Sequence, residues 1–157
     1  MADIAPGARC DVRLLAEPFD PAAGLARFAD AAALGGQGAV ASFTGLVRSG
    51  GGVDALEITH YAPLTLPGIH ASAEAAAVRF ALYRVLVRHR IGIMRPGEPI
   101  VLVAAAAPHR RAAFDAVDHL MDVLKTASWL WKRERRAGEW RWVEPRADDH
   151  AAAARWH

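Results

Sequence analysis

The pattern of apolar and polar positions predicts a chain that alternates strands and helices, and its clearest element is a helix over residues 108–125. Apolar side chains recur there at three- and four-residue steps, as on one face of an amphipathic helix: Phe114, Val117, Leu120, Met121 and Leu124. Charged side chains fall on another face: Arg111, Asp115, Asp118 and Asp122. Pro108 suits the first turn of this helix, where the N–H that proline lacks would have no partner.

Alternating or continuously apolar runs predict the strands: 10–15, 39–47, 55–61, 83–91, 100–106, 129–135 and 140–143. Further helices are expected over 21–34, 67–82 and 147–157. Asp20 is the expected N-cap of the first of these. The glycine turn at 49–52 is expected to pair the strands on either side of it as a hairpin. Residues 100–106 are apolar without interruption, which places that strand in the centre of the sheet.

Basic residues crowd the first turn of the helix over 108–125: His109, Arg110 and Arg111. The helix dipole disfavours each positive charge there by roughly 0.3–1 kcal/mol, while free backbone N–H groups point outward at the same end. An anion such as a phosphate or a carboxylate would make this arrangement favourable. The alternative is a solvated basic patch in which Arg111 pairs with Asp115, one turn away.

Both lysines of the chain lie near the other end of this helix. The 19 basic residues are 17 arginines and two lysines, and the lysines are Lys125 and Lys132. An ammonium is a compact charge whose pKa shifts on desolvation, so it can transfer protons where arginine cannot. The alternatives are a favourable cation at a helix C-terminus for Lys125 and a strand lysine that extends past Leu130 to solvent for Lys132. We favour a shared chemical role.

The other candidate residues carry weaker signals. Arg48 ends a strand beside three glycines, a position that suits either a ligand contact or an ordinary surface arginine. His89 has apolar residues two positions away on both sides and is interpreted as a core histidine, and His60 and Tyr61 are interpreted as structural. A catalytic role is disfavoured for Cys10, which has no catalytic partner nearby in sequence. No set of His, Cys, Asp or Glu has metal-ligand spacing, so neither a metal nor a cofactor is expected.

Composition indicates one globular domain over residues 1–157, because 53% of the residues are hydrophobic and 23% are charged. The two ends, residues 1–9 and 147–157, are expected to be less ordered. A net charge of +2 is too small to indicate nucleic acid as a partner, and no apolar run is long enough to span a membrane. The single cysteine cannot form an internal disulfide, which favours a cytoplasmic location.

Several segments together resemble the catalytic (large) subunit of molybdopterin synthase. They are GAVASFTGLVR at 38–48, LEITHY at 56–61, VRHRIGIMRPGE at 87–98, and PHRRAAFDAVDHLMD followed by LKTASWLWKRE within 107–134. The resemblance runs from about residue 11 to the tail. Two positions depart from it: Leu46 stands where the family often has lysine, and Trp129 stands where it usually has proline.

The resemblance implies an α+β domain of the α/β hammerhead type with a mainly antiparallel sheet. It also implies an enzyme of molybdenum-cofactor biosynthesis, a sulfur transferase that converts cyclic pyranopterin monophosphate to molybdopterin. The sulfur donor would be the C-terminal Gly-Gly thiocarboxylate of a small ubiquitin-like subunit. A homodimer of the large subunit would stand at the centre of a heterotetramer.

By the same resemblance, Lys125 and Lys132 are the expected catalytic residues. The expected substrate-binding residues are Arg48, His109, Arg110, Arg133 and Glu134. The family suggests a dimer in which His109 and Arg110 reach the site from the neighbouring subunit. The rival hypothesis is a non-catalytic dimeric module that binds an anion or a nucleotide, or a scaffold of the same fold, in which arginine would replace either lysine with little loss.

Overall fold

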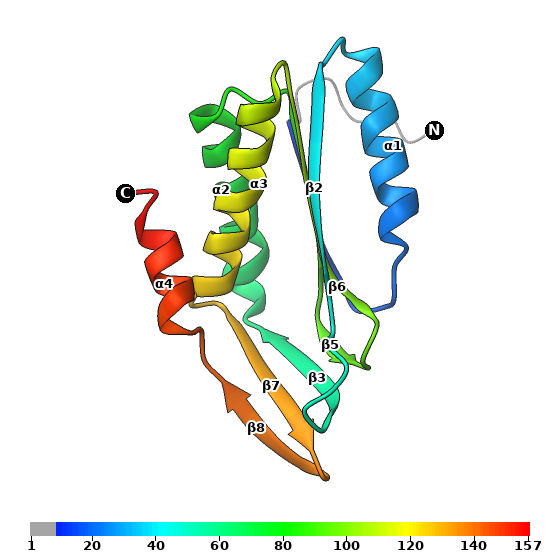
Figure 1. Cartoon of the computed structure of the whole chain (residues 1–157), viewed down its shortest axis with the longest axis vertical. Helices are drawn as coiled ribbons and strands as arrows, with labels where there is room; N and C mark the ends of the chain where they lie inside the picture. Colours follow the sequence, from blue (N-terminus) through cyan, green and yellow to red (C-terminus); the bar gives the residue numbers. More distant parts are fainter. Residues whose placement is uncertain (1–8) are drawn as a thin grey trace.

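The strands of the protein form two four-stranded sheets, as the computed structural model of residues 9–157 shows (Figure 1). The strands are β1 (Cys10–Leu15), β2 (Ala39–Leu46), β3 (Val53–His60), β4 (Arg84–Arg90), β5 (Gly92–Met94), β6 (Pro99–Ala107), β7 (Leu130–Arg136) and β8 (Glu139–Val143). The helices are α1 (Pro21–Leu34), α2 (Ala62–Arg79), α3 (Arg110–Thr126) and α4 (Ala147–Ala154). Residues 1–8 of the predicted less ordered N-terminal end lie outside the described residues.

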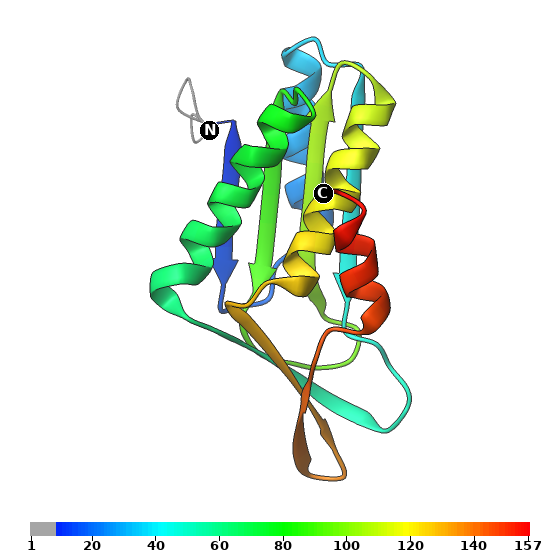
Figure 2. The same ribbon diagram turned by 90° about the vertical axis from the view of Figure 1, so that its left-hand side faces the viewer.

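The two sheets follow the orders β1-β4-β6-β2 and β5-β3-β7-β8. The pair of β1 and β4 is parallel and the remaining pairs are antiparallel, which confirms the predicted α+β class with a mainly antiparallel sheet. Helix α1 covers one face of the first sheet and α2 and α3 cover the other, while the second sheet extends beyond one end of the first (Figures 1 and 2). Helix α4 packs against α3.

Strand β6 is the centre of the fold, as its uninterrupted apolar sequence predicted. It lies between β4 and β2, and its side chains alternate between two buried clusters. One set packs with Phe28 and Ala32 of α1: Leu102, Ala104 and Ala106. The other packs with α2 and α3: Val101, Val103, Ala105 and Ala107. A strand buried on both faces needs no polar alternation, which explains the pattern.

Helix α1 begins where the sequence predicts. The Asp20 carboxylate accepts hydrogen bonds from the Ala22 and Ala23 N–H groups at 2.9 and 3.2 Å, and Pro21 occupies the first helical position. These bonds satisfy N–H groups that have no partner inside the helix. The local capping signal is therefore sufficient to fix this helix start.

The predicted pairing of residues 39–47 with 55–61 is wrong. β2 pairs with β6 in the first sheet, while β3 pairs with β5 and β7 in the second. The glycines of the connecting turn have positive φ angles of 108°, 63° and 76° at Gly50, Gly51 and Gly52. A backbone in this left-handed region turns sharply, and here it takes the chain from one sheet to the other instead of closing a hairpin.

Helix α3 differs from the prediction at its start and on its apolar face. It begins at Arg110, with His109 as N-cap, so Pro108 lies before the helix and not in its first turn. Phe114, expected in the core, is 59% exposed, and Ala113 and Ala116 face the sheet in its place. The buried stripe is therefore rotated toward small residues, which bring the helix close to β2 and β6.

Helix α2 begins at Ala62, five residues earlier than predicted, and contains Pro67. Its buried face consists mainly of small residues, and the apolar side chain of Val78 is exposed. The absence of a side chain at Gly68 makes room for Trp129, because a Cβ at position 68 would lie 2.6 Å from Trp129 Cε2. Thr65 Oγ1 donates a 2.7 Å hydrogen bond to the Trp129 carbonyl and so fixes the same contact.

Candidate functional site

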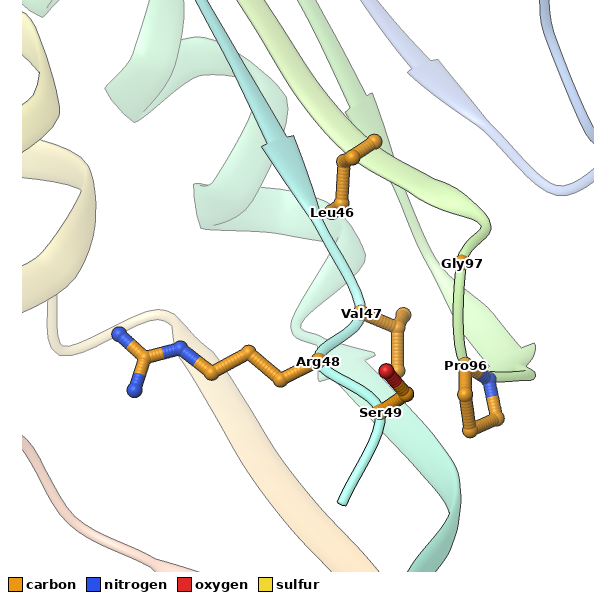
Figure 3. Close-up of a pocket in the computed structure, with 6 residues that line it drawn as sticks. All are labelled: Leu46, Val47, Arg48, Ser49, Pro96 and Gly97. Carbon is orange, nitrogen blue, oxygen red and sulfur yellow. The ribbon is translucent and has the colours of Figure 1, made fainter.

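Arg48 lies two residues after the end of β2, at the rim of a shallow cavity of about 560 Å³. The cavity is lined by Leu46, Val47, Arg48, Ser49, Pro96 and Gly97. Figure 3 shows the Arg48 side chain extending away from Pro96 and Gly97. Within residues 9–157, no carboxylate forms an ion pair with this guanidinium, so its charge is available to an anionic ligand.

Lys132 lies on β7, opposite Ile58 of β3. It shares one face of the second sheet with Leu130 and Glu134, because side chains alternate along a strand. Its ammonium is 3.7 Å from Glu134 Oε1 and half-exposed. Ile58 and Leu130 pack in one apolar cluster with Val47, the residue before Arg48, so Lys132 and Arg48 border the same cluster.

Lys125 lies in the last turn of α3, where a cation complements the helix dipole. The preceding residue, Leu124, is buried in the main core, and Leu130 packs against both this core and the cluster that contains Val47. Leu130, the first residue of β7, therefore joins the core that contains the end of α3 to the apolar cluster that contains Val47. The ammonium of Lys125 is 3.4 Å from Asp149 Oδ1 of α4.

Arg133 and Glu134 point to opposite faces of β7. Glu134 shares the face of Lys132, whereas Arg133 forms an ion pair with Glu57 and stacks over the Trp140 ring at 4.6 Å. A guanidinium held by a carboxylate and an aromatic ring is a structural arrangement. The structure therefore brings Glu134, but not Arg133, to the side of the sheet that carries Lys132.

His109 and Arg110 lie at the opposite end of α3 from Lys125. The helix has 17 residues and is therefore about 25 Å long at 1.5 Å per residue. Together with Gly38, Pro108 and Arg111, His109 and Arg110 line a second cavity of about 510 Å³. One chain thus holds two separate basic sites, with Arg48, Lys125 and Lys132 at one end and His109 and Arg110 at the other.

Structural roles, not functional ones, are observed for three further residues: Arg111, His89 and Cys10. Arg111 lies 3.8 Å from Asp115 one turn along, the surface pair that was the alternative to anion binding. His89 is buried, its Nδ1 is 2.8 Å from the Arg90 carbonyl, and burial lowers its pKa, which confirms a core histidine. Burial raises the pKa of the Cys10 thiol to about 11, so this cysteine is protonated and inert at neutral pH.

Sequence reasoning missed Asp149 and the attachment of α4. Asp122, placed on the charged face of α3, is 8% exposed, and its Oδ2 accepts hydrogen bonds from Arg155 at 3.0 Å and Trp156 at 2.7 Å. These bonds hold α4 against α3 and bring Asp149 to Lys125. The Arg146 N–H and then Lys125 lower the pKa of Asp149. The only local signal was a pair of acidic residues in the first turn of α4, which is typical of a helix start.

Two absences hold for the part of the chain that the structure describes. No group of three His, Cys, Asp or Glu side chains there could hold a metal ion. None of its helices is both long enough and apolar enough to cross a membrane.

Comparison with known proteins gives consistent matches. The model of the MoaE protein family matches residues 14–127. The molybdopterin synthase catalytic subunit of Cereibacter sphaeroides is 47% identical over 146 residues, which are 92% of this chain and 99% of the relative. The molybdopterin cofactor biosynthesis protein E of Burkholderia multivorans superposes with a TM-score of 0.76 at 38% identity, over 95% of this chain and 96% of that one. A protein–protein complex of subunits 1 and 2 of molybdopterin-converting factor from Helicobacter pylori shares the fold, with a TM-score of 0.75 at 17% identity over 86% of this chain and 91% of that one.

Proposed function

This chain belongs to the MoaE protein family, and on that premise we propose that it is the catalytic subunit of a molybdopterin synthase, which converts cyclic pyranopterin monophosphate to molybdopterin. One observation carries the proposal at residue level. The only two lysines of the chain stand at adjoining ends of α3 and β7, and Arg48, which has no ion-pair partner among the described residues, follows Val47 of the apolar cluster that also contains Leu130. The rival binding module or scaffold is not favoured, because the relatives are named catalytic subunits.

The chemistry of the proposed reactants explains why the site is cationic. A pterin monophosphate and a thiocarboxylate are both anions, and they must meet for sulfur to be transferred. Coulomb repulsion between two like charges about 4 Å apart is about 4 kcal/mol near a protein surface. Arg48, Lys125 and Lys132 offset this repulsion, so that the two anions can occupy neighbouring positions.

We assign separate roles to the three cations. Lys125 offsets the negative charge that grows in the transition state and moves protons, which a titratable ammonium can do. Lys132, held by Glu134 at 3.7 Å, orients the thiocarboxylate or the substrate. Arg48 binds the phosphate, since a guanidinium presents several N–H donors to phosphate oxygens.

The sulfur donor in this proposal is a small ubiquitin-like subunit that carries a C-terminal Gly-Gly thiocarboxylate. The two-subunit complex from Helicobacter pylori, which shares the fold, supports the presence of a second subunit as partner. A Gly-Gly end has no side chains and can enter a narrow site in an extended conformation. The reducing cytoplasm suits both the thiocarboxylate and the free thiol of Cys10.

The arrangement of α3 supports a homodimer, within a heterotetramer, as the working unit. Because His109 and Arg110 are a helix length away from Lys125, they can complete its site only from the partner subunit. β2 is an edge strand of the first sheet and carries the exposed Phe43, and the neighbouring α3 carries the exposed Phe114. These apolar side chains provide a surface on which a second copy can pack, with the two copies of α3 antiparallel.

The test of the function is a reconstitution. The purified chain is mixed with cyclic pyranopterin monophosphate and the thiocarboxylated small subunit, and formation of the dithiolene product is followed. The control contains the same small subunit with an ordinary C-terminal carboxylate, which has no sulfur to give. Product only with the thiocarboxylate supports the proposal, and absence of product with both donors contradicts it.

A further inference from the structure

The turn between β5 and β6 holds the backbone that carries Arg48. The Gly97 N–H donates a hydrogen bond to the Val47 carbonyl at 2.8 Å, and the Val47 N–H donates one to the Glu98 carbonyl at 2.9 Å. β2 has already shifted its register against β6 between Gly45 and Leu46. Beyond this shift, the two bonds from the turn fix the residue that precedes Arg48.

A buried arginine lies behind this turn. Arg90, the last residue of β4, is 3% exposed, and its Nη2 donates a 3.4 Å hydrogen bond to the Ile93 carbonyl. Its Nη1 lies 3.8 Å from Glu98 Oε1, and its Nε and Nη1 have no hydrogen-bond partner among residues 9–157. A guanidinium stays charged in a protein, and a buried charge is costly without a counter-charge. Glu98 supplies that counter-charge.

Glu98 connects the buried arginine to the segment after β2 that carries Arg48. One carboxylate oxygen faces Arg90, and the other accepts a hydrogen bond from the Arg95 N–H, which closes the turn. The backbone carbonyl of the same residue accepts from Val47. Arg90 thus acts on three neighbouring segments: β5 through Ile93, the turn through the Glu98 side chain, and the residue after β2 through the Glu98 backbone.

We propose that Arg90 and Glu98 are positioning residues for substrate binding, because their ion pair sets the turn that fixes Val47 and thereby the direction in which Arg48 presents its guanidinium. The inference rests on the assignment of Arg48 to the substrate phosphate. It makes a specific claim: loss of the Glu98 charge weakens binding of the anionic substrate through Arg48 and leaves the chemical step intact.

The test measures kcat and KM for the cyclic pterin with the full chain and the thiocarboxylated small subunit. Glu98→Gln keeps the side-chain volume and removes the charge. KM is expected to rise about fivefold to tenfold, as for loss of one charge-assisted contact, while kcat changes less than about twofold. In an Arg48→Ala background, the same substitution is expected to change KM less than about twofold, because its effect passes through Arg48.

Asp54→Asn is the matched control. Asp54 of β3 forms a 2.8 Å pair with Arg135 of β7, on the two inner strands of the second sheet, so this change also removes a carboxylate from an arginine pair. KM is expected to stay at the wild-type value in this variant. Thermal unfolding verifies that each variant is folded, and Glu98→Asp, which keeps the charge but shortens its reach, replaces Glu98→Gln if the latter does not fold.

Two results overturn the positioning role. The first is an equal rise in KM with and without Arg48, which shows that Glu98 acts independently of it. The second is a fall in kcat at constant KM. If Arg48→Ala alone leaves KM unchanged, Arg48 does not bind the substrate, and the inference falls together with that assignment. A wild-type chain that makes no product contradicts the proposed function itself, which distinguishes the two failures.

Discussion

The ammonium of Lys125 lies 3.4 Å from the Asp149 carboxylate, so the lysine proposed to act in catalysis is paired with a residue of the C-terminal helix. Asp122 anchors that helix to α3 through Arg155 and Trp156. The Lys125 side chain is 54% exposed, and exposed ion pairs stabilise by only about 0–1 kcal/mol. The pair is therefore weak enough for an incoming anionic reactant to replace Asp149 at the ammonium.

Replacement of Lys125 by arginine tests whether catalysis needs a titratable ammonium or only a positive charge. Lys125→Arg keeps a cation that can still pair with Asp149, but it loses the titratable ammonium. We expect turnover to fall about 100-fold or more, on the order of 3 kcal/mol, with a smaller change in substrate affinity. Single-turnover measurements of product formation check this. Full activity of the variant would support the binding-module alternative.

Removal of Arg48 should affect substrate binding more than chemistry. Because a phosphate contact forms in the ground state as well as in the transition state, Arg48→Ala is expected to raise KM about tenfold with kcat largely retained. Steady-state kinetics at varied concentrations of the pterin check this. Arg13→Ala is the control, since Arg13 is exposed, pairs with Asp11 and lies on β1, at the opposite edge of the first sheet from β2. A fall in kcat alone would assign Arg48 to the chemical step.

A mixture of two inactive variants tests whether one site uses two subunits. A dimer of Lys125→Ala with Arg110→Ala has one site in which both residues are intact, if each site takes Arg110 from the partner subunit. Random exchange should then restore about a quarter of wild-type activity, since half of the dimers are mixed and each has one working site. No recovery in verified heterodimers contradicts a site that is shared between the two subunits. Sedimentation that shows only a 16.9 kDa species at micromolar concentration contradicts the dimer.

The C-terminal end of the small subunit is expected to contribute to turnover and to contribute little to the affinity between the subunits. Deletion of its two C-terminal glycines removes the sulfur-bearing group and leaves its folded surface unchanged. We expect turnover to be abolished and the affinity between the subunits, measured by titration calorimetry, to change less than about tenfold. An equal loss of affinity and activity would show that the tail anchors the complex.

Attachment of α4 is expected to depend on pH through His119. The imidazole packs edge-on against Trp156 at a centroid distance of 5.1 Å and against Phe80 at 5.6 Å. Burial lowers the pKa of His119, Arg79 and His157 lower it further, and Asp122 acts in the opposite direction.

The sign of the dependence follows from this lowered pKa. The docked state binds a proton less readily than the undocked state, in which the histidine pKa is about 6.5. The contribution of His119 to docking is therefore complete above about pH 6.5 and declines as the pH falls through the lowered pKa. Tryptophan fluorescence compared with that of Trp156→Phe reports docking between about pH 7.5 and 5.5. His119→Phe should flatten the curve, and a flat wild-type curve would contradict the prediction.

Local signals in the sequence were sufficient for features that depend on a single helix or strand. The Asp20 cap and the apolar run of β6 specify their structures within a few residues, and both predictions are confirmed. The separation of Arg110 from Lys125 also follows from helix length alone. These features require no knowledge of distant contacts.

Long-range pairing was not predictable in the same way. A glycine turn permits either a hairpin or a change of sheet, and the choice depends on β6 and β7, which follow much later in the chain. The burial of Asp122 depends on Arg155 and Trp156, more than thirty positions away, so the periodicity of α3 assigned it to the solvent face. Arg133 was grouped with Glu134 by the family resemblance, although alternation along β7 places their side chains on opposite faces.

The contact between Gly68 and Trp129 makes two positions that are distant in sequence depend on each other. A Cβ at position 68 would lie 2.6 Å from Trp129 Cε2, so tryptophan at position 129 is accommodated only while position 68 lacks a side chain. A larger residue at position 68 would displace α2 from Trp129, which directly precedes the strand that carries Lys132. The identity of one residue therefore limits which residues the other position can accept: a side chain at position 68 is tolerated only once Trp129 has been replaced by a smaller residue.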